Sequence, residues 1–269
     1  MMQKMIALVL VLVMALSLVA CGGSAAEKTI TIAASATPHA EILAVAKKVL
    51  AKDGWKLEIV EYAGYVVPNT VVDDGEMDAN YFQHQPYLDT FNAENGTQLV
   101  SVAAIHYEPL GIYPGTKADV EALVEDDQVA IPSDGSNRAR ALRLLEAKGL
   151  IKLADDVGMQ ATVLDIVENP LHLEIVEMEA AQIAGVRDSV ALAVINGNYA
   201  LLAGLNVTTD AIASEDAASV SAQTYANILV VKAGNENAEK IQALKAALMS
   251  EEVKAFINET YSGAVVPLF

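Results

Sequence analysis

Strand-like and helix-like segments alternate along this chain, and that alternation limits the possible folds more than any other feature. Residues 28–35 (KTITIAAS) are rich in β-branched side chains and predict a strand. Apolar residues at helical spacing follow Thr37-Pro38 and predict a helix that stops near Gly54. Residues 55–62 alternate apolar and polar side chains and predict a second strand. Because a β-α-β order favours a parallel sheet with a right-handed crossover, we expect an α/β fold.

The alternation continues to the C-terminus, and a chain of 269 residues has enough material for two lobes. We place the first crossing between lobes near residue 112 and the return crossing near residue 226. The first lobe would then comprise residues 28–112 and 226–269, and the second lobe residues 113–225. Further strands are expected at 98–105, 128–132, 172–178, 191–195 and 227–231, and further helices at 138–148, 238–249 and 252–261.

Residues 78–88 (DANYFQHQPYL) concentrate three aromatic rings, a histidine and several carboxamides, although only 5% of the chain is aromatic. Pro86 interrupts a helix begun upstream and suits the first turn of a new one, which places Phe82, His84 and Tyr87 around a strand-to-helix junction. Folds of the α/β class open their ligand crevices at such junctions. We interpret the stretch as the wall of a pocket for a small, partly apolar molecule. Core packing is the alternative for Phe82 and Tyr87.

The N-terminus has the pattern of a signal peptide. Lys4 precedes an apolar run up to Ala20, which is short for a membrane span but typical of a signal-peptide core. The run ends in small residues before Cys21, which resembles the lipidation motif of bacterial lipoproteins. Cys21 is the only cysteine, so no intrachain disulfide is possible. We expect removal of residues 1–20, acylation of Cys21 with chains such as palmitate, and a tether over residues 21–27. A free thiol in a secreted protein is the alternative.

Composition and motifs disfavour several function classes. The chain carries 17 Lys+Arg against 35 Asp+Glu, a net charge of −18, and nucleic acid is not an expected partner because phosphate binding needs a basic face. The sequence has no nucleophile elbow, no Gly-rich phosphate loop and no Cys or His pair at metal-ligand spacing. We therefore expect no catalytic residues, no cofactor and no metal. Because the chain has 35 Asp and Glu residues, a pair of carboxylates that catalyses hydrolysis remains an open alternative. The four histidines lie far apart: His39, His84, His106 and His172.

Polar residues near the predicted strand ends are candidates for ligand contacts. Arg140 lies in the first turn of a predicted helix, where the helix N-terminus and a guanidinium could bind one anion. The alternative is an ordinary solvated helix residue. Asn196 and Asn198 directly follow an apolar strand, at the end where ligands bind in open α/β sheets. For these two asparagines the alternative is turn formation or helix capping.

Several segments resemble the methionine-binding lipoproteins of the MetQ/NlpA family, which feed ABC importers. They span nearly the whole mature chain in the order of the family. The similar segments are TPHAE (37–41), YVVPN (65–69), DANYFQHQPYLD (78–89), IPSDGSNRARAL (131–142), GLIKL (149–153), VENP (167–170), AVINGNYA (193–200), YAN (225–227) and YSGAVVPLF (261–269).

The resemblance implies a two-lobed periplasmic-binding-protein fold of type II, with a central ligand cleft and two crossover segments. Carried over by position, Arg140 would clamp the carboxylate of the ligand, and Asn196 and Asn227 would hold its ammonium and carboxylate groups. A polarizable thioether is favourable near aromatic ring edges. Four side chains would enclose that thioether: Tyr65, Phe82, His84 and Tyr87.

The resemblance further implies a lipid-anchored monomer on the extracytoplasmic side of the cell membrane. It would deliver L-methionine to an ABC permease with its ATPase subunits. D-methionine, methionine sulfoxide and a methionyl dipeptide are alternative ligands. A lipid-anchored hydrolase and an interaction protein with a vestigial cleft are alternative functions. One segment departs from the family: residues 182–187 (QIAGVR) stand where the family usually has Gln-Leu-Pro-Arg. This departure leaves the geometry of one loop in the second lobe open.

Overall fold

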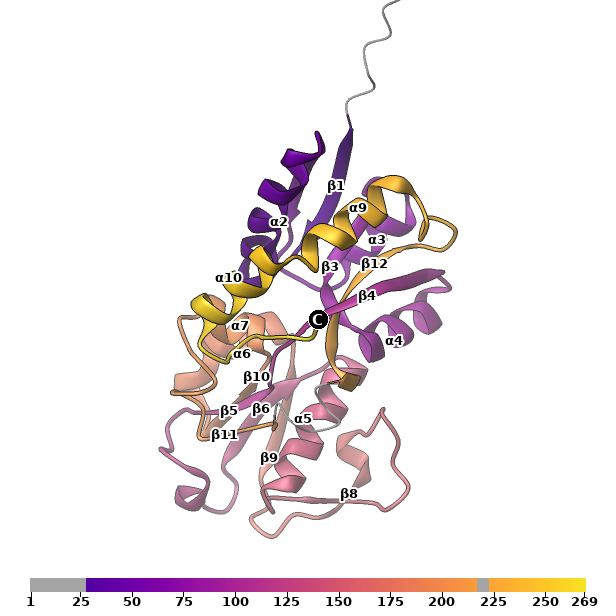
Figure 1. Ribbon diagram of the computed structural model, residues 1–269. Helices are drawn as coiled ribbons and strands as arrows, with labels where there is room; N and C mark the ends of the chain where they lie inside the picture. The colour runs from indigo at the N-terminus through magenta and orange to yellow at the C-terminus, as the bar shows by residue number, and fades with distance from the viewer. Residues whose placement is uncertain (1–27, 217–222) are drawn as a thin grey trace, which may run out of the picture.

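A computed structural model describes residues 28–216 and 223–269 (Figure 1). Strands and helices alternate as predicted and form two α/β lobes, each built around its own sheet. The predicted signal peptide, Cys21 and the tether lie outside the described residues. The chain first crosses between the two sheets at residues 108–110 and returns to the first sheet by residue 226.

The first lobe contains a sheet of six strands in the order β13-β4-β12-β3-β1-β2. Strand β1 pairs in parallel with β2, which confirms the arrangement predicted from the β-α-β pattern. Strand β12 returns from the C-terminal part of the chain and pairs antiparallel with both β3 and β4. This insertion brings Asn227 of β12 into register with His84 and His106. The bounds are β1 Thr29–Ala34, β2 Lys56–Glu61, β3 Ala79–His84, β4 Leu99–Tyr107, β12 Ala226–Lys232 and β13 Val266–Pro267.

Helices of the first lobe pack on its sheet and on one another, with α2 against α9 and α10. Helix α4 begins directly after β3, as Pro86 predicted. His84 caps this helix by accepting the backbone N–H of Tyr87 at Nδ1, and Gly96 ends it in the left-handed conformation. The bounds are η1 Ala36–Ala40, α2 Glu41–Lys52, α3 Val67–Asp73, α4 Gln85–Asn95, α9 Glu239–Leu248 and α10 Glu251–Tyr261.

The second lobe contains a sheet of five strands in the order β11-β5-β10-β6-β9. Strand β6 pairs in parallel with β9 and β10, whereas β5 runs antiparallel to β10 and β11. Because β5 begins at Gly111, this sheet starts two residues before the expected lobe boundary at residue 113. A separate small sheet joins β7 Lys152–Leu153 to β8 Ile166–Glu168. The bounds in the large sheet are β5 Gly111–Pro114, β6 Gln128–Pro132, β9 Glu174–Met178, β10 Leu192–Ile195 and β11 Ala213–Ser214.

Helix α5 begins three residues earlier than expected, because Asp134 caps it by accepting the backbone N–H of Asn137 at 2.9 Å. Residues 182–187, the segment that differs from the usual family sequence, lie mostly in helix α6. The side chain of Ile183 in this helix is completely buried. The bounds are η2 Val120–Ala122, α5 Gly135–Ala147, η3 Val163–Asp165, α6 Ala180–Val186, η4 Arg187–Ser189 and α7 Gly197–Leu202.

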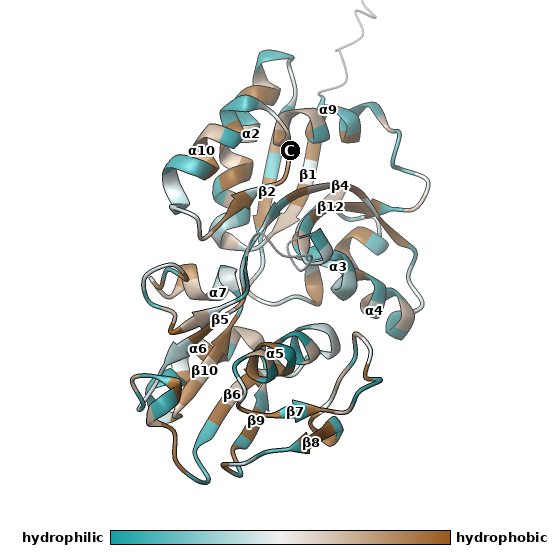
Figure 2. Ribbon diagram, turned by 60° about the horizontal axis from the view of Figure 1, so that its bottom comes forward, coloured by the Kyte–Doolittle hydropathy of each residue, from teal (hydrophilic) through white to brown (hydrophobic). Residues whose placement is uncertain are grey.

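Apolar side chains fill the space between sheets and helices in both lobes. In Figure 2, brown segments along the strands mark these apolar residues. All four residues of β10 are buried, which agrees with its wholly apolar sequence. One apolar cluster begins under the first sheet at Ile30 and Ile32 and continues through Ile195 and Tyr199 of the second lobe. The two lobes therefore share packed surface beside the crossing segments.

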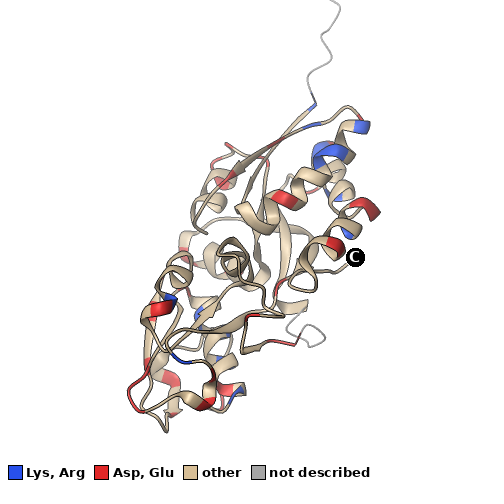
Figure 3. Cartoon of the chain, turned by 90° about the vertical axis from the view of Figure 1, so that its left-hand side faces the viewer, with Lys and Arg blue, Asp and Glu red and all other residues tan. Residues whose placement is uncertain are grey.

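Charged residues lie mainly on the outer helices and loops, where acidic and basic side chains are interspersed, while the central strands are largely uncharged (Figure 3). The excess of acids in the sequence is thus spread over the surface. Such a distribution is expected to favour solubility.

Gly115, just after β5, is a site where the backbone packing tolerates no side chain. A Cβ atom there would lie 2.2 Å from the carbonyl oxygen of Val190 and 2.5 Å from that of Arg187. We expect Gly115→Ala to lower the free energy of unfolding by about 2–4 kcal/mol, measured by urea denaturation. Gly185→Ala in helix α6 is the matched control, because no atom lies within 4 Å of its added Cβ. Equal stability of the two variants would contradict this packing argument.

Candidate functional site

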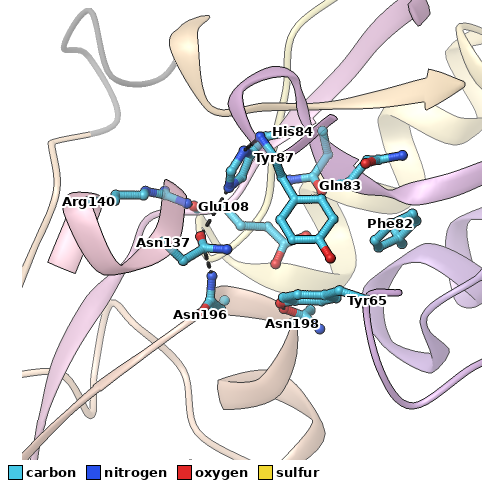
Figure 4. A pocket seen from close by; sticks show the side chains of 12 residues that line it. Tyr65, Phe82, Gln83, His84, Tyr87, Glu108, Asn137, Arg140, Asn196 and Asn198 are labelled. Atoms are coloured by element: carbon cyan, nitrogen blue, oxygen red, sulfur yellow. Dashed lines mark hydrogen bonds between the residues drawn. The ribbon is translucent and has the colours of Figure 1, made fainter. Parts of the chain in front are cut away.

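A pocket lies between the two sheets, beside the crossing segment (Figure 4). Its walls come from both lobes. All seven residues expected at the ligand site from the sequence line it. The lining residues are Tyr65, Phe82, Gln83, His84, Tyr87, Glu108, Asn137, Arg140, Asn196, Gly197, Asn198 and Asn227.

One side of the pocket is aromatic. Figure 4 shows the rings of Tyr65, Phe82 and Tyr87 gathered there, with centroids 5.5–6.0 Å apart. The hydroxyl of Tyr65 donates to Asn198 Oδ1 at 2.6 Å, and burial raises the pKa of Tyr65 well above its ordinary value. The hydroxyl is therefore a neutral hydrogen-bonding group. This side of the pocket suits an apolar or thioether side chain.

The opposite side is polar and is organised around Asn137. Its Oδ1 atom accepts hydrogen bonds from His84 Nε2 at 3.0 Å and from Asn196 Nδ2 at 2.8 Å. Its Nδ2 atom donates to the carboxylate of Asp134 at 3.0 Å. Asn137 thus joins the end of β3 in the first lobe to the start of α7 in the second.

Asn196 leaves one acceptor open. Its Oδ1 atom is buried, and no group among the described residues donates to it. An unsatisfied buried acceptor costs about 1–3 kcal/mol, so the pocket is prepared for a ligand that carries a donor. Asn196 is also the N-cap residue of α7 by position, although its side chain makes no capping bond. The alternative of simple helix capping is therefore wrong for this side chain.

His84 is a fixed neutral imidazole. Because its Nδ1 atom accepts the N–H of Tyr87, the proton lies on Nε2, which donates to Asn137. Burial, followed by the nearby Arg140, lowers the pKa of His84 to about 3. The ring can therefore donate from Nε2 at neutral pH without adding a charge to the pocket.

Arg140 is buried, with only 4% of its surface exposed, so the alternative of an ordinary solvated helix residue is wrong. Its Nη2 atom donates to the backbone carbonyl of Glu108 at 2.9 Å. The ring centroid of Tyr225 lies 4.3 Å from the guanidinium carbon. The carboxylate of Glu215 accepts from Nε at 2.8 Å and from Nη2 at 2.5 Å. Arg140 therefore reaches the pocket as a paired, rigidly held cation.

A hydrogen-bonded acidic cluster adjoins the polar side. Glu108 Oε1 accepts from His106 Nε2 at 2.6 Å and lies 3.5 Å from His39 Nε2. Gly197 leaves room for this carboxylate, because a Cβ there would lie 2.7 Å from Glu108 Oε2. Burial raises the pKa of Glu108, and the charge interaction with His39 opposes this. His39 also contacts Asn227 Oδ1 through Nε2 at 2.9 Å, which ties this cluster to the pocket wall.

The ligand-type atoms of His39, His106 and Glu108 lie within 4.8 Å of one another, as in a metal site. Hydrogen bonds already engage several of them: His106 contacts Tyr81 at Nδ1 and Glu108 at Nε2, and His39 contacts Asn227 at Nε2. A cation would have to break these contacts. Of the ring nitrogens in this set, only His39 Nδ1 has no hydrogen-bond partner among the described residues. Because the other nitrogens of the set are already hydrogen-bonded, we assign no metal to it.

Sequence reasoning did not assign Gln83, Glu108, Asn137 and Gly197 to the site, and it left Asn198 between turn and ligand roles. Asn137 lies in the polar run SDGSN (133–137) just before a predicted helix, and Asn198 follows an apolar strand, so a signal for both was present in the sequence. Glu108 belongs to the segment that was interpreted only as a crossing. Residues 182–187, which differ from the usual family sequence, do not line the pocket.

The low pKa of His84 predicts a specific pH dependence of stability. The unfolded chain binds a proton at His84 below pH 6.5 but the folded chain only near pH 3, so this stabilisation is complete above pH 6.5 and is lost as the pH falls toward 3. Between pH 7 and pH 5 the wild-type chain should lose about 2 kcal/mol more than His84→Asn, which keeps a capping side chain without the titration. Urea denaturation at both pH values measures this, and parallel losses would contradict the assignment.

Comparison with known proteins places this geometry in a family. The family described as NlpA lipoprotein matches residues 30–269. The D-methionine-binding lipoprotein MetQ of Escherichia coli (strain K12) is 39% identical over 268 residues, covering 98% of this chain and 97% of that protein. Among solved structures, a lipoprotein from Ruminococcus gnavus is 57% identical with a TM-score of 0.89, covering 90% of this chain and 100% of that chain.

A nutrient-binding protein from Burkholderia cenocepacia, whose structure contains methionine, is 41% identical with a TM-score of 0.85, covering 89% of this chain and 100% of that chain. These likenesses confirm the predicted two-lobed fold of the type II periplasmic-binding-protein class and the resemblance recognised in the sequence. Within the described residues, no helix is both long and apolar enough to cross a membrane. The chain belongs to the NlpA lipoprotein family, whose members include the MetQ substrate-binding proteins of ABC importers.

Proposed function

We propose that this chain captures free methionine in the pocket between its lobes and delivers it to an ABC permease with its ATPase subunits. The observation that carries the proposal is the division of one pocket into two chemically different sides. Aromatic rings form one side, and a guanidinium, an unpaired amide oxygen and a carboxylate form the other. A zwitterion with an apolar side chain matches both sides at once.

The charged groups of the ligand would bind on the polar side. Arg140 would hold the carboxylate through the part of its guanidinium that faces the pocket. The open Oδ1 atom of Asn196 and the carboxylate of Glu108 would accept hydrogen bonds from the ammonium group. Asn227, which is fixed by His39, would contribute its amide N–H to the carboxylate. This distribution assigns Asn196 to the ammonium and Asn227 to the carboxylate.

The thioether would lie against Tyr65, Phe82 and Tyr87, with His84 at the boundary between the two sides. Sulfur near ring edges gains about 0.3–1.5 kcal/mol per contact, so the side chain would add both affinity and selectivity. The relatives support methionine as the ligand, since one is named a D-methionine-binding lipoprotein and another contains methionine in its structure. L-methionine is our first choice, and D-methionine, methionine sulfoxide and a methionyl dipeptide are the competitors to test.

Ligand binding would hold the two lobes closed. Contacts already cross between them: His84 donates to Asn137, Tyr65 donates to Asn198, and the hydroxyl of Tyr199 donates to the carbonyl oxygen of Ala63 at 2.8 Å. A ligand that touches both walls would add to these bonds only in the closed state. It would therefore shift the population toward closure around the crossing segments.

The chain would act as a monomer at the membrane. We propose that Cys21 carries the lipid anchor, that the folded lobes face the extracytoplasmic side, and that no chemical step occurs in the pocket. Membership of a lipoprotein family supports the anchor. The two relatives from Escherichia coli and Burkholderia cenocepacia are named for binding, which supports a receptor over a hydrolase.

Native mass spectrometry of the purified full chain in detergent tests the ligand directly. We expect a bound mass equal to methionine that leaves on partial unfolding and dialysis and returns when L-methionine is added. Competition with D-methionine, methionine sulfoxide and Gly-Met then ranks the alternatives. A chain that binds none of these compounds would overturn the proposal, and cleavage of Gly-Met into glycine and methionine would favour the hydrolase.

Asn196→Ala tests the ammonium assignment. Removing the acceptor should weaken L-methionine binding by about 1–3 kcal/mol, measured by calorimetry, because the ammonium loses a buried hydrogen bond. The analogue 4-(methylthio)butanoate has the same carboxylate and thioether but no ammonium, and its affinity should change much less. Equal losses for both ligands would show that Asn196 does not contact the ammonium.

A further inference from the structure

The side chain of Arg140 lines the pocket and also pairs with Glu215, which lies on its other side. The ion pair is bidentate, through Nε and Nη2, and both side chains are nearly buried, with 4% and 10% of their surfaces exposed. Glu215 does not belong to the pocket lining, whereas Arg140 does. A groove on the other side of Arg140 is lined by both residues. The carboxylate of Glu215 therefore stands behind the guanidinium and outside the ligand space.

Glu215 is itself fixed by groups other than Arg140. Its Oε2 atom accepts the hydroxyl of Tyr107 at 2.7 Å and the backbone N–H of Leu110 at 3.0 Å. Its own backbone N–H donates to the carbonyl oxygen of Leu110 at 3.0 Å. Burial alone would raise the pKa of Glu215, but Arg140 and these hydrogen bonds outweigh burial and lower it. Glu215 is thus a charged, immobile acceptor.

The remaining contacts of Arg140 complete a rigid holder. Its Nη2 atom also donates to the carbonyl oxygen of Glu108, and the ring of Tyr225 lies against the guanidinium. No hydrogen bond joins Nη1 to another of the described residues, so this nitrogen is open to a ligand. A long arginine side chain normally loses much rotamer entropy when it binds a ligand. In this chain Arg140 already loses that rotamer entropy on folding, so its guanidinium is preorganised for a ligand.

We propose that Glu215 is the positioning residue of the carboxylate subsite. It turns the guanidinium of Arg140 so that Nη1 faces the pocket, and it balances the buried charge while no ligand carboxylate is present. This inference rests on the proposed function, because it assigns Glu215 a role in binding a ligand carboxylate. It also links the subsite to both crossings, since Tyr107 precedes the first crossing, Leu110 lies in it, and Tyr225 precedes the return strand β12.

Glu215→Gln tests the proposal by ligand selectivity. A carboxamide has only one acceptor oxygen, so it cannot satisfy Nε, Nη2, Tyr107 and Leu110 together. Calorimetry on the full chain in detergent compares L-methionine with L-methioninol, which keeps the ammonium and thioether but lacks the carboxylate. We expect methionine to bind about tenfold or more weakly, from the loss of a charge-assisted arrangement, and methioninol to change less than about threefold.

A matched control lies on the same helix. Arg138 pairs with Glu177 at 3.5 Å, but that pair is more exposed and neither residue lines the pocket. Glu177→Gln should leave both affinities unchanged within about twofold. Tyr107→Phe removes one of the bonds that hold Glu215 and should reduce the selectivity for methionine in the same direction, by a smaller factor. Thermal unfolding of each variant separates loss of fold from loss of positioning.

Three outcomes overturn the proposal. If Glu215→Gln lowers the thermal midpoint but leaves the methionine-to-methioninol ratio unchanged, Glu215 has only a structural role. If the variant binds methionine more tightly, Glu215 competes with the ligand for Arg140 instead of positioning it. If Arg140→Lys and Glu215→Gln have additive effects on methionine affinity, the two residues do not act as a unit. Failure of the wild-type chain to bind methionine would instead refute the proposed function, which keeps the two tests distinct.

Discussion

The hydrogen bond from His84 Nε2 to Asn137 Oδ1 is the contact on which the arrangement of the pocket depends. It is possible only because β3 ends where α4 begins, so that His84 can cap the helix with one ring nitrogen and cross to the second lobe with the other. Asn137 then positions Asn196 through the same oxygen. One neutral donor therefore links the two lobes and helps to orient the open amide oxygen, without placing a charge between them.

Buried charge around the pocket is arranged so that each ionic group has partners from more than one segment. Arg140 is matched by Glu215, and Glu108 is matched by two imidazoles whose pKa values are lowered, to about 4 for His39 and about 3 for His106, chiefly by burial. Isolated buried charges would cost several kcal/mol each, whereas paired and hydrogen-bonded charges are tolerated. The polar side therefore holds one cation, Arg140, one carboxylate, Glu108, and fixed dipoles, an environment that can bind a zwitterion without rearrangement.

Much of this organisation was predictable from the sequence, because local signals agreed with the global fold. The wholly apolar strand β10, the helix start at Pro86 and the parallel pairing of β1 with β2 each follow from periodicity or from backbone chemistry. The pocket residues of β3 and α4 were predicted because aromatic side chains cluster there in a chain with few of them. Strand β5 was missed because Pro109 and Gly111 make its segment look like a turn. Strand β13, with two residues, is too short to show a period.

The partners of the site residues could not be predicted, because they are set by contacts between distant segments. Glu215 is 75 residues from Arg140, and nothing local distinguishes it from the other acids in the sequence. His39 and Asn227 are 188 residues apart and meet only because β12 returns between β3 and β4. Periodicity specifies which face of an element is buried, but pairing among buried polar groups is decided when elements pack and each donor must find an acceptor. The insertion of β12 is therefore the topological step that turns separate motifs into one pocket, since it places a crossing segment and three strand ends around the same site.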